Sequence, residues 1–311
     1  MGALLDVILP VFLVLGAGYI ARWRNLFSDE FADGLMVFAQ QYAIPCMLFL
    51  AMASLDLKAG FDIGLLASFY LGVVAAFIIG AIGARLIFGR APEDSVAIGF
   101  SAFFSNTVLL GLAIMQRAYG PDALAPNYAI IALHAPSLYV AGIITMELVK
   151  GRGTGVSFNV LREVAVSIST NAIVIGIALG ILVNLSGLSM PSVADAALQM
   201  LARAGLPAAL FGLGAVLFRY RPEGDMRVIA FVALVSLIIH PAISWVLATQ
   251  VFALSTGQLR AVIVTSAMAP GVNTYLFANM YGVAKRVAAS SVLICTALSL
   301  LTAWFWLSIL P

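Results

Sequence analysis

Long apolar segments separated by short polar breaks run along the whole chain. Each segment has about the 20 residues that a helix needs to cross the hydrocarbon core of a membrane. The breaks between them are short and polar, as in "GRAPED" and "KGRGTG". We predict an all-α integral membrane protein with ten transmembrane helices, at 3–21, 31–54, 63–88, 95–116, 127–149, 163–186, 193–218, 228–251, 259–281 and 287–310.

Composition agrees with this prediction. Hydrophobic residues make up 63% of the 311 residues and charged residues 10%, whereas soluble domains carry about 25% charged residues. The net charge of +2 is spread over the loops, so nothing indicates nucleic-acid binding. Cys46 and Cys295 lie in separate apolar segments, and no disulfide, metal or other cofactor is expected. The first segment has no basic residue ahead of it, so we expect a span, not a cleaved signal peptide.

Lysine and arginine predict the orientation, because they concentrate in cytoplasmic loops. The loops after spans 1, 3, 5, 7 and 9 carry twelve of them, and the opposite side carries three. We therefore expect a multi-pass protein of the plasma (inner) membrane with both termini on the outer face. The three are Lys58, Arg117 and Arg260; the twelve are Arg22, Arg24, Arg85, Arg90, Lys150, Arg152, Arg162, Arg219, Arg221, Arg227, Lys285 and Arg286.

Two halves of the chain carry similar segments. "AIPCMLF" at 43–49 matches "GLPAALF" at 205–211 at an offset of 162, and the same offset carries Gly18 onto Gly180. Because each half has five spans, the second half would enter the membrane from the other side. We predict an inverted repeat, with a first unit at 1–150, a cytoplasmic linker at 151–161 and a second unit at 162–311.

The couplet Asn-Thr occurs in both halves, at Asn106-Thr107 in span 4 and at Asn273-Thr274 in span 9, an offset of 167. Inverted repeats commonly bind their solute where interrupted helices meet. We therefore expect spans 4 and 9 to be broken and to cross at a substrate site. Proline and glycine favour such breaks and hinges, and the candidates are Pro45, Gly111, Pro207, Pro270 and Gly271.

Four stretches carry a resemblance to a known family: "LPVFLVLGAGYIARW", "YAIPCMLF", "FSNTVLLGLAI" and "MAPGVNTYLFANMYG". The chain resembles the auxin efflux carrier family, in the bacterial branch that includes malonate and malate carriers. The resemblance implies a ten-helix fold similar to that of bile-acid symporters and sodium–proton antiporters, crossing helices 4 and 9, organic-anion substrates and a homodimer as one option. The chain departs from its relatives at Ala113, where many of them have proline.

Arg203 lies near the middle of span 7, where an arginine is costly unless it faces a cavity or a partner. A guanidinium binds a carboxylate at two points, so Arg203 is the predicted anchor for an anion; an ion pair with Asp195 is the structural alternative. The repeat places Gln41 at the matching position of span 2, four residues before Pro45.

Other polar residues in the spans complete the predicted site. The substrate-binding candidates are Ser105, Asn106, Thr107, Asn273 and Thr274, although asparagine also joins membrane helices and threonine also bonds to its own helix. His134 and His240 are possible proton carriers, with a structural role as the alternative. No carboxylate lies at mid-membrane, so strong coupling to sodium or protons is not expected, although backbone carbonyls could hold a sodium ion.

Transport is the function that these features favour. An embedded enzyme needs a nucleophile with a base, an acid pair or a metal motif, and the sequence offers none of these. A channel is commonly a ring of identical subunits, whereas the internal repeat predicts one site within one chain. We expect potential-driven or secondary-active transport of an organic anion, with malonate, malate and auxin-like acids all open, and an ion-coupled symporter of another solute as the alternative.

Overall fold

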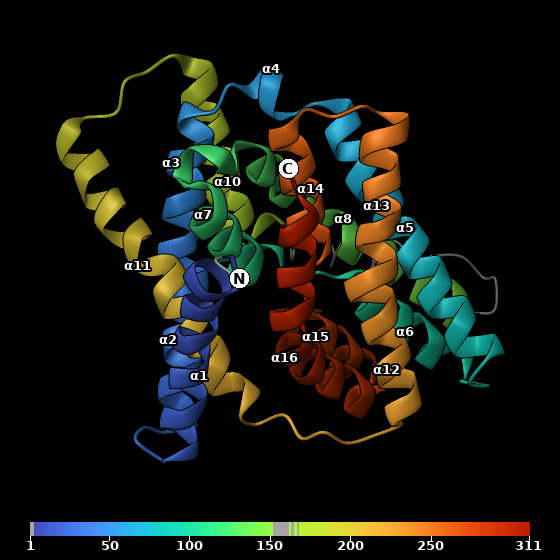
Figure 1. The fold of residues 1–311 in the computed structure, drawn as a ribbon. Helices are drawn as coiled ribbons and strands as arrows, with labels where there is room; N and C mark the ends of the chain where they lie inside the picture. Colours follow the sequence, from blue (N-terminus) through green and yellow to red (C-terminus); the bar gives the residue numbers. More distant parts are fainter. Residues whose placement is uncertain (1–2, 152–161, 163–164, 167) are drawn as a thin grey trace.

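The computed structural model describes residues 3–151, 162, 165–166 and 168–311, and within them the regular structure is helical. Figure 1 shows the arrangement. Labels with η mark π-helical turns and the single 3-10 turn, η4. The elements are η1 (Ala3–Ile8), α1 (Leu9–Trp23), α2 (Asp29–Phe38), η2 (Ala39–Ala43), α3 (Ile44–Ser54), α4 (Leu57–Gly60), α5 (Ile63–Leu86), α6 (Pro92–Phe103), η3 (Thr107–Gly111), α7 (Leu112–Tyr119), η4 (Pro121–Leu124), α8 (Ala125–Lys150), α10 (Ala172–Ser186), α11 (Ser192–Leu217), α12 (Met226–Leu234), η5 (Val235–Ile239), α13 (His240–Val246), η6 (Leu247–Val251), α14 (Thr256–Ser266), α15 (Val272–Tyr281) and α16 (Lys285–Ile309).

Seven helical segments of the described chain are long and apolar enough to cross a membrane: Asp6–Trp23, Asp29–Ser54, Ile63–Leu86, Pro121–Lys150, Ser192–Leu217, Met226–Val251 and Lys285–Ile309. The predicted all-helical membrane fold is therefore confirmed. Predicted spans 95–116 and 259–281 are each divided into shorter helices, and α10 covers only the second part of predicted span 163–186. Ten spans in a 5+5 repeat stay a prediction, as does the division into two units, whose linker at 151–161 falls almost wholly outside the described residues.

The helices form two groups. Helices α1, α2, α3, α10 and α11 pack on one another, and we call this group the panel. Helices α5, α6, α8, α12, α13, α14, α15 and α16 form the second group, which we call the core body. Figure 1 shows the panel helices α1, α2, α3 and α11 on the left and the core body on the right. The cavity described below lies where the two groups face each other.

Glycines allow the panel helices to pack closely. A Cβ on Gly18 of α1 would overlap the carbonyl oxygen of Phe211 in α11. A Cβ on Gly180 of α10 would lie 2.5 Å from the carbonyl oxygen of Phe49 in α3. At an offset of 162, Gly18 corresponds to Gly180 and Phe49 to Phe211. The two contacts therefore repeat, with the roles of the two halves of the chain exchanged.

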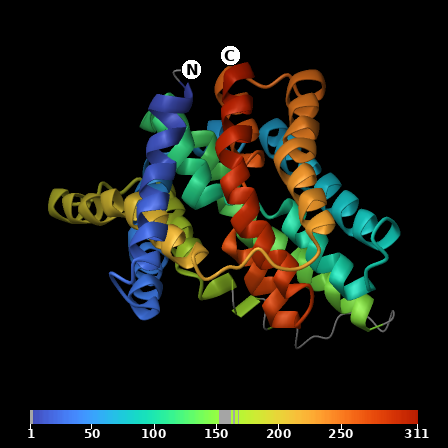
Figure 2. The same ribbon diagram turned by 60° about the horizontal axis from the view of Figure 1, so that its bottom comes forward.

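The two ends of the chain lie on the same side of the molecule. Turn η1 packs against α16, and the labelled termini are neighbours in both Figure 1 and Figure 2.

Ion pairs join helix ends outside the apolar layer. Arg219 follows α11 and donates two hydrogen bonds, of 2.9 and 2.6 Å, to the carboxylate of Asp33 in α2. The hydrogen bonding to the Asp33 carboxylate raises the pKa of Arg219 above its usual value. Arg90 and Asp225 form a second pair at 2.7 Å. Because all four side chains are partly exposed, each pair is expected to contribute about 1 kcal/mol at most.

Candidate functional site

Two helix breaks meet in the middle of the molecule. The first, at 104–106, separates α6 from η3, and the second, at 267–271, separates α14 from α15. The backbone N–H of Asn106 donates to the carbonyl oxygen of Ala269 at 2.8 Å, and the N–H of Gly271 donates to that of Phe104 at 2.9 Å. Two extended pieces of chain thus satisfy each other's polar groups where water is scarce, which is the condition for a break at membrane depth.

The register of this pairing differs from the register of the sequence match. Ser105 lies opposite Pro270 in an isolated antiparallel bridge, an offset of 165. The local two-fold axis between paired strands therefore relates Asn106 to Gly271, each of which is the residue before the first helical residue of its helix. Asn273 lies two residues further along. The Asn-Thr couplets, matched at an offset of 167, are not equivalent in the backbone pairing.

Asn106 begins its helix by capping it. The Oδ1 of Asn106 accepts a hydrogen bond from the N–H of Leu109 at 3.2 Å, which satisfies one of the N–H groups that lack a partner inside a helix. No side chain caps α15, whose N-cap is Gly271. Thr274 bonds to its own helix, since its hydroxyl donates to the carbonyl of Gly271 at 2.9 Å. The helix dipole adds a partial positive charge at each of these N-termini.

A cavity of about 450 Å³ opens beside the paired breaks. Its walls come from both helix groups: the breaks, α8 and α15 of the core body, and η2 and the start of α10 on the panel side. Most of the lining is apolar, and the side chains include Ile131, Ile143, Ile173, Val174, Leu276 and Met280. None of the described lining residues is Asp, Glu, Lys or Arg.

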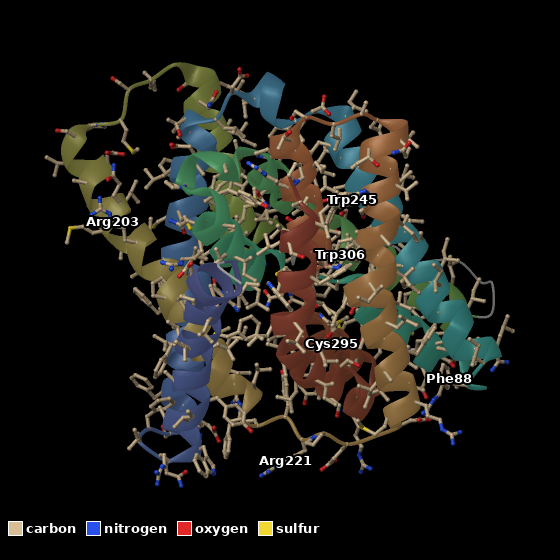
Figure 3. The ribbon with its side chains drawn as sticks, in the orientation of Figure 1. Phe88, Arg203, Arg221, Trp245, Cys295 and Trp306 are labelled. Carbon is tan, nitrogen blue, oxygen red and sulfur yellow. The ribbon has the colours of Figure 1, made fainter. Side chains whose placement is uncertain are left out.

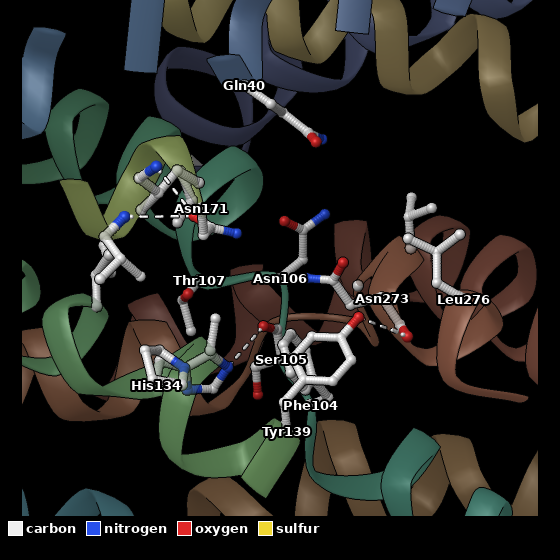
Figure 4. Close-up of a pocket in the computed structure, with 18 of the residues that line it drawn as sticks. Gln40, Phe104, Ser105, Asn106, Thr107, His134, Tyr139, Asn171, Asn273 and Leu276 are labelled. Atoms are coloured by element: carbon white, nitrogen blue, oxygen red, sulfur yellow. Dashed lines mark hydrogen bonds between the residues drawn. The ribbon is translucent and has the colours of Figure 1, made fainter. Parts of the chain in front are cut away.

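Four amide side chains surround the open space of this cavity. Figure 4 shows Gln40 pointing down from η2, Asn171 pointing in from the start of α10, and Asn106 and Asn273 side by side at the breaks. Asn171 caps α10, because its Oδ1 accepts from the N–H groups of Ile173 at 3.0 Å and Val174 at 3.3 Å. The Oδ1 atoms of Asn106 and Asn171 are therefore engaged with backbone, which leaves their NH₂ groups as the donors available to a ligand.

Aromatic rings form the floor of the cavity. His134 of α8 is buried, and its Nε2 lies 3.2 Å from the carbonyl oxygen of Ser105. The ring of Phe104 packs edge-on against His134, with centroids 5.0 Å apart, and against Tyr139, at 5.5 Å. The hydroxyl of Tyr139 lies 3.5 Å from the carbonyl oxygen of Asn273. These contacts tie α8 to both helix breaks.

The structure brings several predicted site residues together. Ser105, Asn106, Thr107, His134, Gly271 and Asn273 all line the cavity. Pro270 lies in the second break itself. Gly111 ends the π-helical turn η3 and is buried, while Pro45 lies in the first turn of α3, also buried. Pro207 lies inside α11.

Arg203 and Gln41 do not line the cavity. Figure 3 shows Arg203 on the N-terminal part of α11, which stands apart from the other helices, and the side chain is exposed. Gln41 is also exposed. The neighbouring residue Gln40 enters the cavity instead, because one step along a helix turns the side chain by about 100°. The repeat thus indicated the helical turn that reaches the cavity, but Gln40 and not Gln41 lines it.

His240 is fully buried in α13 and does not line the cavity. Its ring and that of His134 both pack against Phe69, each with its centroid 5.7 Å from the centroid of the phenylalanine ring. Neither ring nitrogen of His240 has a hydrogen-bond partner among the described residues. Of the two predicted proton carriers, His134 therefore lines the cavity and His240 does not.

Asn171, Tyr139 and Gln40 are cavity residues that the sequence did not single out as site residues. Asn171 carried a usable signal, because an asparagine directly before an apolar helix is a typical N-cap, and a cap fixes the direction of its amide. Tyr139 carried no such sequence signal, since its place in the cavity depends on how α8 packs against the two breaks.

A comparison of the whole sequence with known families identifies the protein's relatives. A family model described as "Membrane transport protein" matches residues 3–307. The chain belongs to this membrane transport protein family. The resemblance to auxin efflux carriers is thereby confirmed, and the family is one of membrane transporters.

Relatives in named organisms are also described as transporters. The protein is similar to the uncharacterized transporter YfdV of Escherichia coli K12, with 21% identity over 304 residues, which are 96% of this chain and 95% of the relative. The YfdV proteins of Escherichia coli O157:H7 and Shigella flexneri match to the same extent. The similarity extends over nearly the full length of both proteins, so the two helix breaks lie within the shared region.

Proposed function

We propose that this transporter moves organic carboxylates by alternating access, and that the cavity beside the paired breaks is its substrate site. The observation that carries the proposal is the meeting of two helix breaks beside a cavity whose polar groups come from both helix groups. A solute bound there would contact the panel through Gln40 and Asn171 and the core body through Asn106 and Asn273. Relative movement of the two groups would then expose it on alternate sides.

The inverted repeat supports this mechanism. The reciprocal contacts Gly18–Phe211 and Gly180–Phe49 are what two equivalent, oppositely inserted five-helix units would make, and the paired breaks add a local two-fold axis at the centre. We therefore propose ten crossings, with the divided segments 95–116 and 259–281 as spans 4 and 9. Two such units can exchange conformations of similar energy, which alternating access requires.

Hydrogen-bond donors favour an anion as the substrate. The NH₂ groups of Asn106 and Asn171 are free to donate because their oxygens cap helices. The uncapped N-terminus of α15 adds backbone N–H groups and the positive end of a helix dipole. A carboxylate accepts hydrogen bonds only, so it matches this set of donors.

The apolar lining favours a carboxylate with an apolar body. Isoleucine, valine, leucine and methionine side chains form most of the wall, and no lysine or arginine among the described lining residues would neutralise a second carboxylate. A monocarboxylate with a ring or an alkyl chain would remove apolar surface from water on both sides, at about 25 cal/mol per Å². We propose this class over small dicarboxylates such as malonate and malate.

We further propose that the cavity faces the cytoplasm in this conformation. Its lining includes Met280, near the C-terminal end of α15, and Asn171, at the N-terminal end of α10. Both ends lead to loops on the side that the basic residues predict to be cytoplasmic.

A ligand screen tests the substrate proposal. Phenylacetate, benzoate and octanoate would be compared with malonate and malate in thermal-shift and calorimetric titrations of the purified protein. The proposal predicts saturable binding of the monocarboxylates and weaker binding of the dicarboxylates. Tight binding of dicarboxylates alone would contradict the proposed substrate class, and binding of no carboxylate would contradict the anion site itself.

A further inference from the structure

His134 lines the substrate cavity, and one of its ring nitrogens is buried without a hydrogen-bond partner among the described residues. Its side chain is 2% exposed, and its Nε2 lies 3.2 Å from the carbonyl oxygen of Ser105 in the first helix break. A carbonyl oxygen only accepts hydrogen bonds, so Nε2 carries the hydrogen in the neutral ring. The lone pair is then on Nδ1, which has no hydrogen-bond partner among the described residues. The geometry thus fixes which nitrogen takes up a proton.

No acidic or permanently charged group faces this imidazole from the described elements packed around it. Phe69 and Tyr70 lie on α5, and the Tyr70 hydroxyl donates to the carbonyl of Ile130 at 2.7 Å. Phe104 at the break separates the imidazole from Tyr139. His240 on α13 packs on the same Phe69 ring and is the titratable group that interacts electrostatically with His134. At neutral pH the tyrosines are uncharged, so His134 is the titratable group that can give the described cavity a charge.

A charged imidazolium in an empty apolar cavity is unfavourable, because nothing replaces its hydration. A carboxylate alone in the same cavity suffers the same penalty. When both are present the two opposite charges stabilise each other, and the attraction is strong where the dielectric constant is low. Binding of the proton and binding of the anion therefore favour each other, and the coupling is reciprocal.

We propose that His134 is a proton-binding site of the transport cycle, taking up one proton at Nδ1 together with the substrate carboxylate. This inference rests on the proposed function. The proton comes from solution and adds to the Nδ1 lone pair, while Nε2–H keeps its bond to Ser105 and no covalent bond of the substrate changes. The cavity then carries a pair with no net charge. When the carboxylate leaves, the imidazolium loses its counter-charge and the proton returns to solution.

His240 is the matched control for this role. It is a second buried histidine at the same 5.7 Å from Phe69, but it does not line the cavity, and neither of its ring nitrogens has a hydrogen-bond partner among the described residues. A general effect of removing a buried imidazole would be shared by both positions. A role in proton-coupled binding belongs to His134 alone.

The test is the pH dependence of phenylacetate binding, measured by calorimetry between pH 5.5 and 8, where this ligand stays ionised. For the wild type and for His240→Gln, the Kd is expected to rise with pH, by up to about tenfold per unit for one linked proton. His134→Gln keeps a donor for Ser105 but cannot be protonated, and its Kd is expected to be independent of pH.

Titrations of the wild type in two buffers of different ionisation enthalpy count the protons directly, so the test does not depend on the folding of a variant. Uptake of about one proton per phenylacetate supports the proposal. No uptake, or a pH dependence that His134→Gln retains, would overturn it while leaving the proposed carboxylate transport in place. Absence of phenylacetate binding to the wild type at every pH would instead overturn the monocarboxylate function on which the proposal rests.

Discussion

Ser105 and Pro270 face each other across an antiparallel bridge at the centre of the protein. They lie in two helix breaks that are far apart in the sequence, and the backbone hydrogen bonds beside them join the two breaks to each other. Because Pro270 has no N–H, it fits the position in the bridge where neither residue donates to the other. The bridge holds in place Asn106, Gly271 and the carbonyl of Ser105, on which the proposed binding of carboxylate and proton depends.

Changing Asn106 separates its capping role from its proposed role in binding. Asn106→Ser keeps an oxygen that can accept the Leu109 N–H, so the melting temperature should stay close to that of the wild type. The variant loses the NH₂ donor, and a hydrogen bond to a charged group contributes about 1.5–3 kcal/mol. We expect the Kd for phenylacetate to rise by about tenfold or more in calorimetric titrations. An unchanged Kd would remove Asn106 from the site.

The corresponding prediction for the panel concerns Asn171, which also combines a capping role with a proposed role in binding. Asn171→Ser should keep the cap of α10 and weaken phenylacetate binding by a similar factor. The control is Asn184, an asparagine of the same helix whose Nδ2 donates to the carbonyls of Met52, Ala53 and Leu55. Asn184→Ala should lower the melting temperature and leave the Kd unchanged. If both variants change the Kd alike, α10 affects binding through stability and not through the amide of Asn171.

Arg203 is expected to be dispensable for binding. Its side chain is exposed on a part of α11 that stands apart from the cavity, so Arg203→Gln should bind phenylacetate with the affinity of the wild type. Calorimetry on the purified variant measures this. A loss of affinity of tenfold or more would restore the anchor role that the sequence predicted, and would mean that α11 reaches the substrate in another conformation.

Close packing of α1 on α11 should make Gly18 sensitive to substitution. A Cβ at this position overlaps backbone, which cannot move aside as a side chain can, so Gly18→Val should lower the melting temperature markedly or prevent folding. Gly16 of the same helix has no atom within 4 Å of the position of a Cβ, and Gly16→Val should be tolerated. Similar losses in both variants would show that helix propensity, and not the contact with Phe211, decides the effect.

A cysteine introduced into the cavity wall can show from which side of the membrane the cavity is accessible. Met280 lines the cavity and is exposed. In a background with Cys46 and Cys295 replaced by serine, Met280→Cys should react with a membrane-impermeant thiol reagent from the cytoplasmic side, and phenylacetate should slow the reaction. Labelling only from the outer side would contradict the predicted orientation.

Much of this fold follows from local features of the sequence. Span lengths, the alternation of apolar segments with polar breaks, and the proline and glycine before Asn273 all act through short-range chemistry, so they were visible without coordinates. The contact between Gly18 and Phe211 was not predicted, because it joins the two halves of the chain, and the offset of 162 showed only that Gly18 corresponds to Gly180.

The site was harder to predict, because side-chain direction depends on small rotations. Gln40 and Gln41 are adjacent, and only packing determines which of them faces the cavity. Arg203 was predicted to need a cavity or a partner because a charge is costly at the centre of a packed membrane helix. In the structure the N-terminal part of α11 lies at the edge of the molecule (Figure 1). The asparagines of the repeated couplet both line the cavity, but the backbone register at the breaks differs from the sequence register by two residues.

Counterflow in proteoliposomes tests directly whether the protein exchanges carboxylates through the cavity at the paired helix breaks. Vesicles loaded with unlabelled phenylacetate and diluted into a trace of the labelled compound would be compared for the wild type and Asn106→Ser. The account predicts transient, saturable accumulation of label by the wild type and much less by the variant. Label that only equilibrates without overshoot in the wild type, or equal accumulation by both proteins, would contradict carboxylate exchange through the cavity at the paired helix breaks.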